Sequence, residues 1–231
     1  MNTLIHLHGA LGASAQFAPL IAELPDYNNL TLDFEGHGSQ PDGGRAFRIE
    51  HFAENLRAFI TENNLAPVRI VGYSMGGYVA LWLAAHEPEL IHSIVTLGTK
   101  FDWSPESAAK EVRFLDPDVM LEKVPAFAAA LERRHTAAGW RTVLEKTKDM
   151  MLDLGANPRI TPDVLLKVAC PVCLGRGDYD TMVSYDETLP VFKHIPNAQM
   201  YMLPATPHPI EKVNAVLWAA VIRTWDNTPH H

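Results

Sequence analysis

Residues 68–77 read VRIVGYSMGG, in which a short apolar run is followed at once by the pentapeptide Gly72-Tyr73-Ser74-Met75-Gly76. The residues that follow are compatible with a helix. A turn this tight between a strand and a helix strains the backbone of its central residue, and the residues two positions away must lack clashing Cβ atoms. The two glycines meet this need. The segment therefore predicts a nucleophilic Ser74 at a helix N-terminus, where backbone N–H groups stabilise a developing oxyanion, although a glycine-rich turn with an idle serine is the alternative.

Short apolar runs recur along the chain and alternate with stretches of helical period. Most of these runs are nearly continuous in apolar content, as expected of strands buried on both faces. The alternation predicts an α/β fold with a doubly wound, mostly parallel sheet and right-handed crossovers. The predicted strands are residues 3–7, 30–34, 68–73, 91–97, 172–174 and 199–203, and the predicted helices are residues 15–24, 49–62, 76–87, 183–193 and 210–225.

The last predicted helix shows a clear helical period. Apolar and small side chains recur on one face, which would pack on the sheet. The residues on this predicted face are Ile210, Val213, Leu217, Ala220 and Thr224, with Val221 beside them.

One region interrupts the alternation of strands and helices. Residues 101–167 contain no convincing strand, but they contain helical patches at 126–134 and 141–154. Prolines divide the region into short helices. We therefore predict a core domain of residues 1–100 and 168–231 with an inserted helical cap at 101–167. The dividing prolines are Pro105, Pro117, Pro125, Pro158 and Pro162.

The composition limits the possible functions. The chain has 231 residues, 47% of them hydrophobic and 20% charged, which is typical of a globular protein. Its formal charge of −8 argues against a nucleic-acid partner and favours a small or neutral substrate. No Lys or Arg precedes Arg45 and no apolar run is long enough to span a membrane, so we expect a cytoplasmic protein without a secretory signal.

The two cysteines, Cys170 and Cys173, form a Cys-Pro-Val-Cys sequence. A redox pair of this spacing needs its first cysteine at a helix N-terminus. These residues instead lie at the start of a predicted strand, where positions three apart point to opposite faces. We expect ordinary core cysteines.

A serine nucleophile needs a base within hydrogen-bond reach and a carboxylate that orients the base. Among eleven histidines, His208 follows the apolar run that ends at Leu203 and precedes the final predicted helix. In a parallel sheet this position lies at the carboxyl edge, on the same rim as Ser74. His208 is the predicted base. We expect the other histidines, including His6, His8, His86, His92 and His194, to be satisfied or solvent-exposed.

The acid is expected at the same edge. Residues 175–180 follow a predicted strand and carry two candidates, Asp178 and Asp180. With either of them, the chain order Ser, Asp, His is that of α/β-hydrolases and differs from the order in chymotrypsin or subtilisin.

The loop after the first predicted strand reads His8-Gly9-Ala10-Leu11-Gly12. Its glycines allow the backbone to pass close to Ser74. The N–H groups of Ala10 and Met75 are therefore the predicted oxyanion donors.

The sequence resembles the α/β-hydrolase superfamily over nearly its whole length. The resemblance rests on residues 8–12 (HGALG), 33–39 (DFEGHGS), 72–77 (GYSMGG), 177–183 (GDYDTMV) and 208–211 (HPIE). It implies that 101–167 is the family's variable cap. The position of the family's acid relative to Pro171 and Val183 favours Asp180 and leaves Asp178 in reserve. The chain departs from the family in having Glu35 before Gly-His-Gly and in starting at what resembles the family's third strand.

The motif at 72–77 also resembles that of the menaquinone-pathway lyase of this fold, which uses arginines to hold substrate carboxylates. Tyr78 stands where that enzyme typically has Arg, which disfavours the lyase. A haloalkane dehalogenase would need Asp at position 74.

The hypothesis that follows is a serine hydrolase, resembling carboxylesterases, that cleaves a small-to-medium ester, with thioester or carbon–carbon hydrolysis possible on the same groups. It needs no metal or organic cofactor. Phe101 and Trp103 are predicted substrate contacts, and Trp140, Met150 and Met151 could add to them or belong to the core of the cap. A lyase, or a ligand-binding protein with slow turnover, is the alternative. The oligomeric state cannot be predicted.

Overall fold

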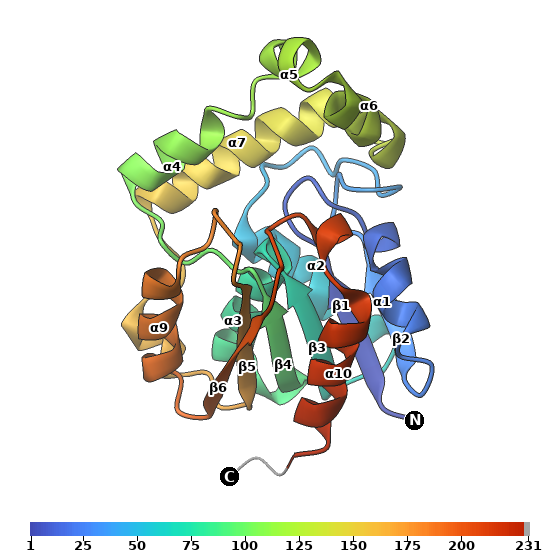
Figure 1. Cartoon of the computed structure of the whole chain (residues 1–231), viewed down its shortest axis with the longest axis vertical. Coiled ribbons are helices and arrows are strands. Elements are labelled where there is room, and N and C mark those ends of the chain that lie inside the picture. Colours follow the sequence, from blue (N-terminus) through green and yellow to red (C-terminus); the bar gives the residue numbers. More distant parts are fainter. Residues whose placement is uncertain (229–231) are drawn as a thin grey trace.

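The computed structural model describes residues 1–228, so the last three residues of the predicted core domain lie outside the described residues. Six parallel strands form one sheet in the order β2-β1-β3-β4-β5-β6 (Figure 1). The doubly wound parallel sheet is confirmed. The strands are β1 (Thr3–Leu7), β2 (Asn28–Leu32), β3 (Val68–Tyr73), β4 (Ile91–Leu97), β5 (Val172–Gly177) and β6 (Ala198–Leu203).

The predicted bounds agree for β1, β3 and β4, whereas β5 continues three residues further, to Gly177, and β6 begins one residue earlier. The edge strand β2 begins and ends two residues earlier than expected. Asn28 and Asn29 pair in register with Thr3 and Leu4 of β1. The Asn29 side chain donates to the carbonyls of Leu24 and Tyr27. Backbone pairing therefore extends into polar residues, which an apolar pattern does not detect.

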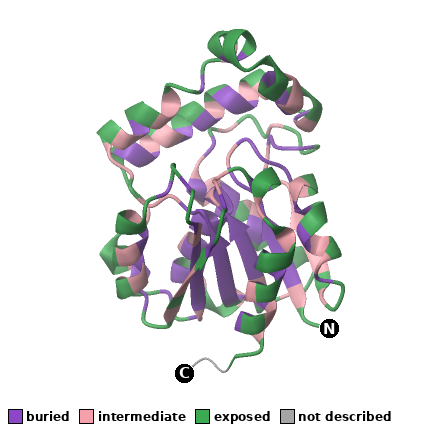
Figure 2. Cartoon of the chain, in the orientation of Figure 1, coloured by how far each residue is buried: buried purple, intermediate pink, exposed green. Residues whose placement is uncertain are grey.

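Helices cover both faces of the sheet. One face carries α2 (Ile49–Glu62), α3 (Met75–His86) and α9 (Tyr185–His194), and the other carries α1 (Ala18–Ala22) and α10 (Ala215–Asp226). The central strands β1, β3, β4 and β5 are largely buried, whereas the edge strands β2 and β6 are partly exposed (Figure 2). Short 3-10 helices, η1 (Ser14–Phe17), η2 (Pro88–Leu90) and η3 (Ile210–Lys212), complete the core.

The predicted face of the last helix is correct in part: Ile210 is buried, but Leu217, Ala220 and Thr224 are exposed. The structure divides the predicted helix into η3 and α10, and Asn214 caps α10 by accepting from the Leu217 amide at 3.2 Å. The break shifts the helical phase, so Leu217 is 39% exposed. The buried side of α10 consists of Trp218, Ala219, Ile222 and Trp225.

Five helices lie between β4 and β5. In Figure 1, α4 to α7 lie above the carboxyl ends of the strands, whereas α8 packs against α3 and α9. Four of the expected prolines stand in the first turns of α4, α5, α6 and α8. The division into core and cap remains a prediction, and residues 101–167 are called the insertion below. Its helices are α4 (Pro105–Val112), α5 (Pro117–Lys123), α6 (Pro125–Arg134), α7 (Trp140–Ala156) and α8 (Pro162–Leu165).

The cysteines are free and buried, as expected. Cys170 and Cys173 belong to hydrophobic clusters on opposite faces of the sheet. Burial raises the pKa of each thiol to about 12, which keeps it protonated and unreactive.

Within residues 1–228, no helix combines the length and the apolar character that a membrane span requires.

Candidate active site

The sheet has a topological switch point between β1 and β3. The chain passes from β1 to its neighbour β2 on one side, and β3 then joins on the other side. Loops that leave the carboxyl ends of β1 and β3 therefore diverge and leave a crevice between them, which is the usual ligand position in open α/β sheets. These two loops carry Ala10 and Ser74.

Ser74 connects β3 directly to α3 and has a left-handed backbone with φ 50° and ψ −117°. This strained conformation is the one that the sequence predicts. The Ser74 amide donates to the carbonyl of Leu97 at 2.9 Å, and the hydroxyl of Thr99 donates to the Ser74 carbonyl at 3.0 Å. Hydrogen bonds to β4 and from the segment after it thus fix both the backbone N–H and the backbone carbonyl of Ser74.

The glycines on both sides of the turn are required by close backbone contacts. A Cβ atom on Gly72 would lie 2.6 Å from the Cα atom of Gly77, and one on Gly76 would lie 2.2 Å from the carbonyl oxygen of Leu7. Because these neighbours are backbone atoms, they cannot move aside as a side chain would. The two glycines allow the turn to pack against both β1 and α3.

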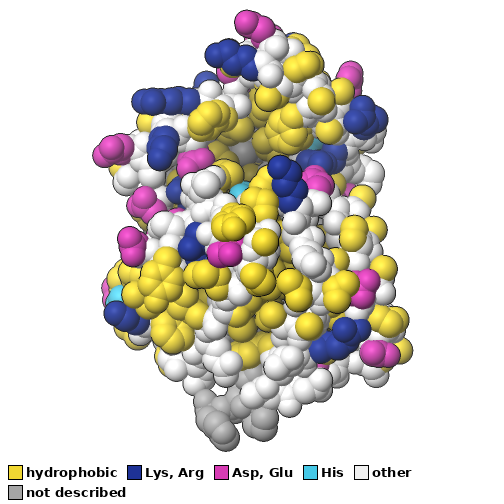
Figure 3. Space-filling view, in the orientation of Figure 1, with side chains coloured by type: hydrophobic (Ala, Val, Ile, Leu, Met, Phe, Trp, Pro, Cys, Tyr) yellow, Lys and Arg dark blue, Asp and Glu magenta, His cyan; other side chains and the backbone are white. Residues whose placement is uncertain are grey.

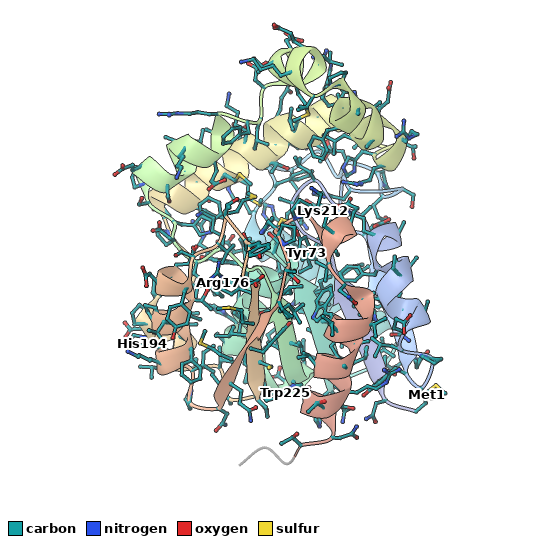
Figure 4. The ribbon with its side chains drawn as sticks, viewed as in Figure 1. Met1, Tyr73, Arg176, His194, Lys212 and Trp225 are labelled. Carbon is teal, nitrogen blue, oxygen red and sulfur yellow. The ribbon has the colours of Figure 1, made fainter. Side chains whose placement is uncertain are left out.

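His208 and Asp180 form a hydrogen-bonded pair beside this turn. The distance from His208 Nδ1 to Asp180 Oδ2 is 2.8 Å. Tyr73 lies at the upper end of the sheet in Figure 4 and donates its hydroxyl hydrogen to the backbone carbonyl of His208. The histidine loop is therefore tied to the residue that precedes Ser74.

Four groups hold Asp180, and three of them, including His208, bind its carboxyl group. Its Oδ1 accepts from the amides of Met182 and Val183, both at 2.9 Å, and its backbone carbonyl accepts from Arg176. Burial would raise the pKa of Asp180, but the hydrogen bond and the charge of His208, together with the two amides, outweigh burial and lower it. Asp180 is therefore an ionised acceptor fixed toward the imidazole.

Asp178 has a different position. Its side chain is exposed, and its Oδ1 accepts from the Thr206 amide at 3.0 Å. This hydrogen bond lowers the pKa of Asp178 and joins two neighbouring loops. The structure thus brings Asp180, and not the reserve candidate Asp178, against His208.

The loop that carries Ala10 is a tight turn. The Gly12 amide donates to the carbonyl of Gly9 at 3.0 Å, and Leu11 between them has φ 58°. Ala10 and Met75 both line the pocket that contains Ser74. This position agrees with the predicted oxyanion donors, whose role remains a prediction.

Two consecutive residues at the end of α6 bind this loop from above. Arg134 Nη1 donates to the Leu11 carbonyl at 2.8 Å, and His135 Nε2 lies 3.0 Å from the same oxygen. His135 Nδ1 also accepts from the Gly38 amide at 3.1 Å. The insertion therefore contacts the loop through hydrogen bonds.

The other histidines of the prediction are absent from the described lining of the pocket that contains Ser74. His6 and His8 are buried, with His6 Nε2 2.8 Å from Asn29 Oδ1 and His8 Nε2 accepting from the Phe34 amide. His86 is exposed and His194 is half-buried, and each lies within hydrogen-bond distance of a carbonyl of its own helix. His92 is exposed. The expectation that they are satisfied or exposed holds for these five residues except at His6, whose buried Nδ1 has no hydrogen-bond partner among the described residues.

Ser74 and His208 line a pocket of about 910 Å³ beneath the insertion. Trp103, Met150 and Met151 line it too, as the sequence suggested. The structure does not place Phe101, the other predicted substrate contact, in the described lining of this pocket. Its ring lies 6.2 Å from that of Tyr78, and Phe101 lines a separate pocket of about 410 Å³ instead. Trp140 is absent from the described lining of the pocket that contains Ser74.

The sequence did not predict several residues of the pocket wall. Lys100 follows β4 at the carboxyl edge, a position that could have been inferred from the strand's end. Phe114, Phe127 and Arg134 come from the insertion, where no sequence pattern indicates which side faces the core. Figure 3 shows hydrophobic side chains gathered across the middle of this face, beneath the helices of the insertion.

Comparison with known families agrees with this architecture. A sequence model described as the alpha/beta hydrolase fold matches residues 2–156. The chain belongs to the α/β-hydrolase family. This family contains many hydrolases, and the strained serine turn and the Asp–His pair lie where its fold places functional loops.

Individual relatives of this α/β-hydrolase differ in activity. A 2-succinyl-6-hydroxy-2,4-cyclohexadiene-1-carboxylate synthase from an Enterobacter species is 32% identical over 95 residues, or 41% of this chain and 36% of that enzyme. A 2-(acetamidomethylene)succinate hydrolase from Mesorhizobium japonicum is 21% identical over 230 residues, or 91% of this chain and 83% of that enzyme. The match to the first relative thus spans little more than a third of its length.

A solved structure supports the fold. A thermophilic esterase from Thermogutta terrifontis, determined with malate bound, superposes with a TM-score of 0.78 at 20% identity. The match covers 100% of this chain and 91% of the esterase.

Proposed function

We propose that this α/β-hydrolase is a serine hydrolase that cleaves a small-to-medium carboxylic ester through an acyl-enzyme on Ser74. The observation that carries the proposal is the 2.8 Å hydrogen bond between His208 Nδ1 and Asp180 Oδ2, in a loop that lines the same pocket as the strained serine. A nucleophile, a base and an orienting carboxylate together form the minimum set for acyl transfer.

The arrangement supports the following sequence of steps. His208 Nε2 takes the hydroxyl proton as Ser74 Oγ attacks the ester carbonyl. The Ala10 and Met75 amides stabilise the oxyanion, and the ionised Asp180 stabilises the imidazolium that forms. The imidazolium returns its proton to the leaving alcohol, and water, activated by the same histidine, then hydrolyses the acyl-enzyme.

A lyase reaction like that of the Enterobacter synthase is the second candidate. In this chain Tyr78 occupies the position of the arginine expected for that activity, and its hydroxyl accepts from the amides of Arg159 and Ile160 at 3.0 and 2.8 Å. This hydroxyl therefore has a structural role within the fold. We favour hydrolysis for this reason.

The test is turnover of p-nitrophenyl esters of increasing chain length, comparing the wild type with Ser74→Ala. We expect a burst of p-nitrophenol, and then steady hydrolysis, from the wild type. Ser74→Ala should lose at least about 10³-fold in kcat, because the acyl-enzyme cannot form. Equal turnover by the variant, or no turnover of any ester by the wild type, would exclude the proposal.

A further inference from the structure

We infer that the acyl group accepted by this site is uncharged, and that the pocket discriminates against acyl groups that carry a second carboxylate. The inference rests on the proposed ester hydrolysis and names its substrate class. The observation behind it is that the enclosed cations in the pocket wall already form ion pairs with carboxylates of the protein.

Lys100 is the most enclosed cation of the wall, with a side chain 14% exposed. Its Nζ lies 3.4 Å from Glu111 Oε1 of α4 and 4.0 Å from Glu187 Oε2 of α9. Both carboxylates are also largely buried, at 13% and 7% exposed. Two negative charges therefore already surround this single positive charge. A substrate carboxylate brought to Lys100 would be a third anion at the same cation.

Arg134, the second enclosed cation, also has partners within the protein. Its Nη2 lies 3.0 Å from Glu211 Oε1, and its Nη1 donates to the Leu11 carbonyl. Glu211 in turn accepts from Gln16 at 2.7 Å. A substrate carboxylate bound to this guanidinium would be a second anion at the same cation, beside Glu211.

The third cation of the wall, Lys110, is exposed on α4, where water solvates it. It lies four residues after the exposed Glu106, a spacing that favours a weak ion pair on a helix. Three cations in the described lining thus face four carboxylates, those of Asp102, Glu106, Glu111 and Glu211. The wall has no surplus of positive charge to offset another anion.

Apolar side chains supply the rest of the wall. Met75, Met150, Met151 and Met182 all line it. Methionine side chains are flexible and polarisable, so they adapt to apolar groups of different shape. Placing an unpaired carboxylate among them would remove its hydration without compensation, which is strongly unfavourable. An aliphatic acyl chain, in contrast, gains from burial there.

The test compares p-nitrophenyl hexanoate with p-nitrophenyl hydrogen adipate, in which a carboxylate replaces the terminal methyl group. We expect the wild-type kcat/KM to be at least about tenfold higher for hexanoate. Rates with Ser74→Ala provide the background for each ester. A kcat/KM for the adipate ester equal to or above that for hexanoate would overturn the inference while leaving the proposed hydrolysis intact. Absence of turnover of both esters that depends on Ser74 would overturn the proposed function and the inference with it.

A pair of variants tests the role of the ion pair. Glu111→Gln keeps the shape of the side chain but removes one of the two anions beside Lys100. The ratio of kcat/KM for hexanoate to kcat/KM for the adipate ester should therefore fall by at least about threefold. Glu122→Gln removes the same charge from an exposed position of α5, outside the described pocket wall, and should leave the ratio unchanged. An unchanged ratio in Glu111→Gln, with thermal stability retained, would overturn the charge argument.

Discussion

At the scale of single residues, Asp178 and Asp180 lie two positions apart but have separate roles in the structure. Asp180 contacts the imidazole of His208, whereas Asp178 binds a backbone amide of the neighbouring loop. Asp180→Asn should lower kcat for ester hydrolysis by about 10²–10⁴-fold, because an amide neither carries the compensating charge nor fixes the productive tautomer. Asp178→Asn keeps an acceptor for Thr206 and should change kcat by less than about threefold. Steady-state kinetics of both variants check this, and a larger loss in Asp178→Asn would transfer the role.

At the scale of elements, α6 holds the loop of Ala10 through Arg134. Arg134→Ala removes the hydrogen bond to Leu11 and the ion pair with Glu211, so the loop should become more mobile and kcat/KM should fall by about three- to tenfold. The adjacent Arg133 is exposed and provides a matched control. Arg133→Ala should retain the wild-type kcat/KM. Equal kcat/KM values for the two variants would show that α6 does not position the loop.

The elements also show where sequence patterns suffice and where they do not. The bounds of β3 and β4 and the turn at Ser74 follow from continuous apolar runs and glycine spacing, since backbone sterics act locally. Leu217, Ala220 and Thr224 of the predicted face are exposed because the cap at Asn214 interrupts the helical period. The position of Phe101 outside the described lining of the Ser74 pocket has another cause. The insertion contacts the core through tertiary packing. Helical periodicity predicts which face of a helix is buried, but it does not predict which element packs against that face.

At the scale of the whole molecule, buried histidines make the fold sensitive to acid. Burial lowers the pKa of His6, His8 and His135 to about 4, against an ordinary value of about 6.5. Between these values the unfolded chain binds more protons than the folded one, so the free energy of unfolding should fall as the pH decreases from about 6.5 to about 4. Each histidine should contribute a slope of up to about 1.4 kcal/mol per pH unit.

Urea unfolding at pH 7, 6 and 5 measures this dependence. His6→Gln keeps a polar partner for Asn29 but cannot take up a proton. Near pH 5 the unfolded variant should therefore bind about one proton fewer than the unfolded wild type, which reduces the slope of the free energy of unfolding with pH by up to about 1.4 kcal/mol per pH unit. A free energy of unfolding that stays constant from pH 7 to pH 5 would contradict the expectation.

Two oxygen atoms of the core each bind a pair of consecutive backbone amides of the insertion, one pair at its start and one between α7 and α8. Glu187 Oε2 accepts the consecutive amides of Phe101 and Asp102, and the Tyr78 hydroxyl accepts those of Arg159 and Ile160. These contacts use only backbone donors of the insertion, so they do not depend on the side chains between residues 103 and 158. Segments of other length and sequence could therefore be exchanged at these two fixed points, which would change the substrate while Ser74, Asp180 and His208 stay in place.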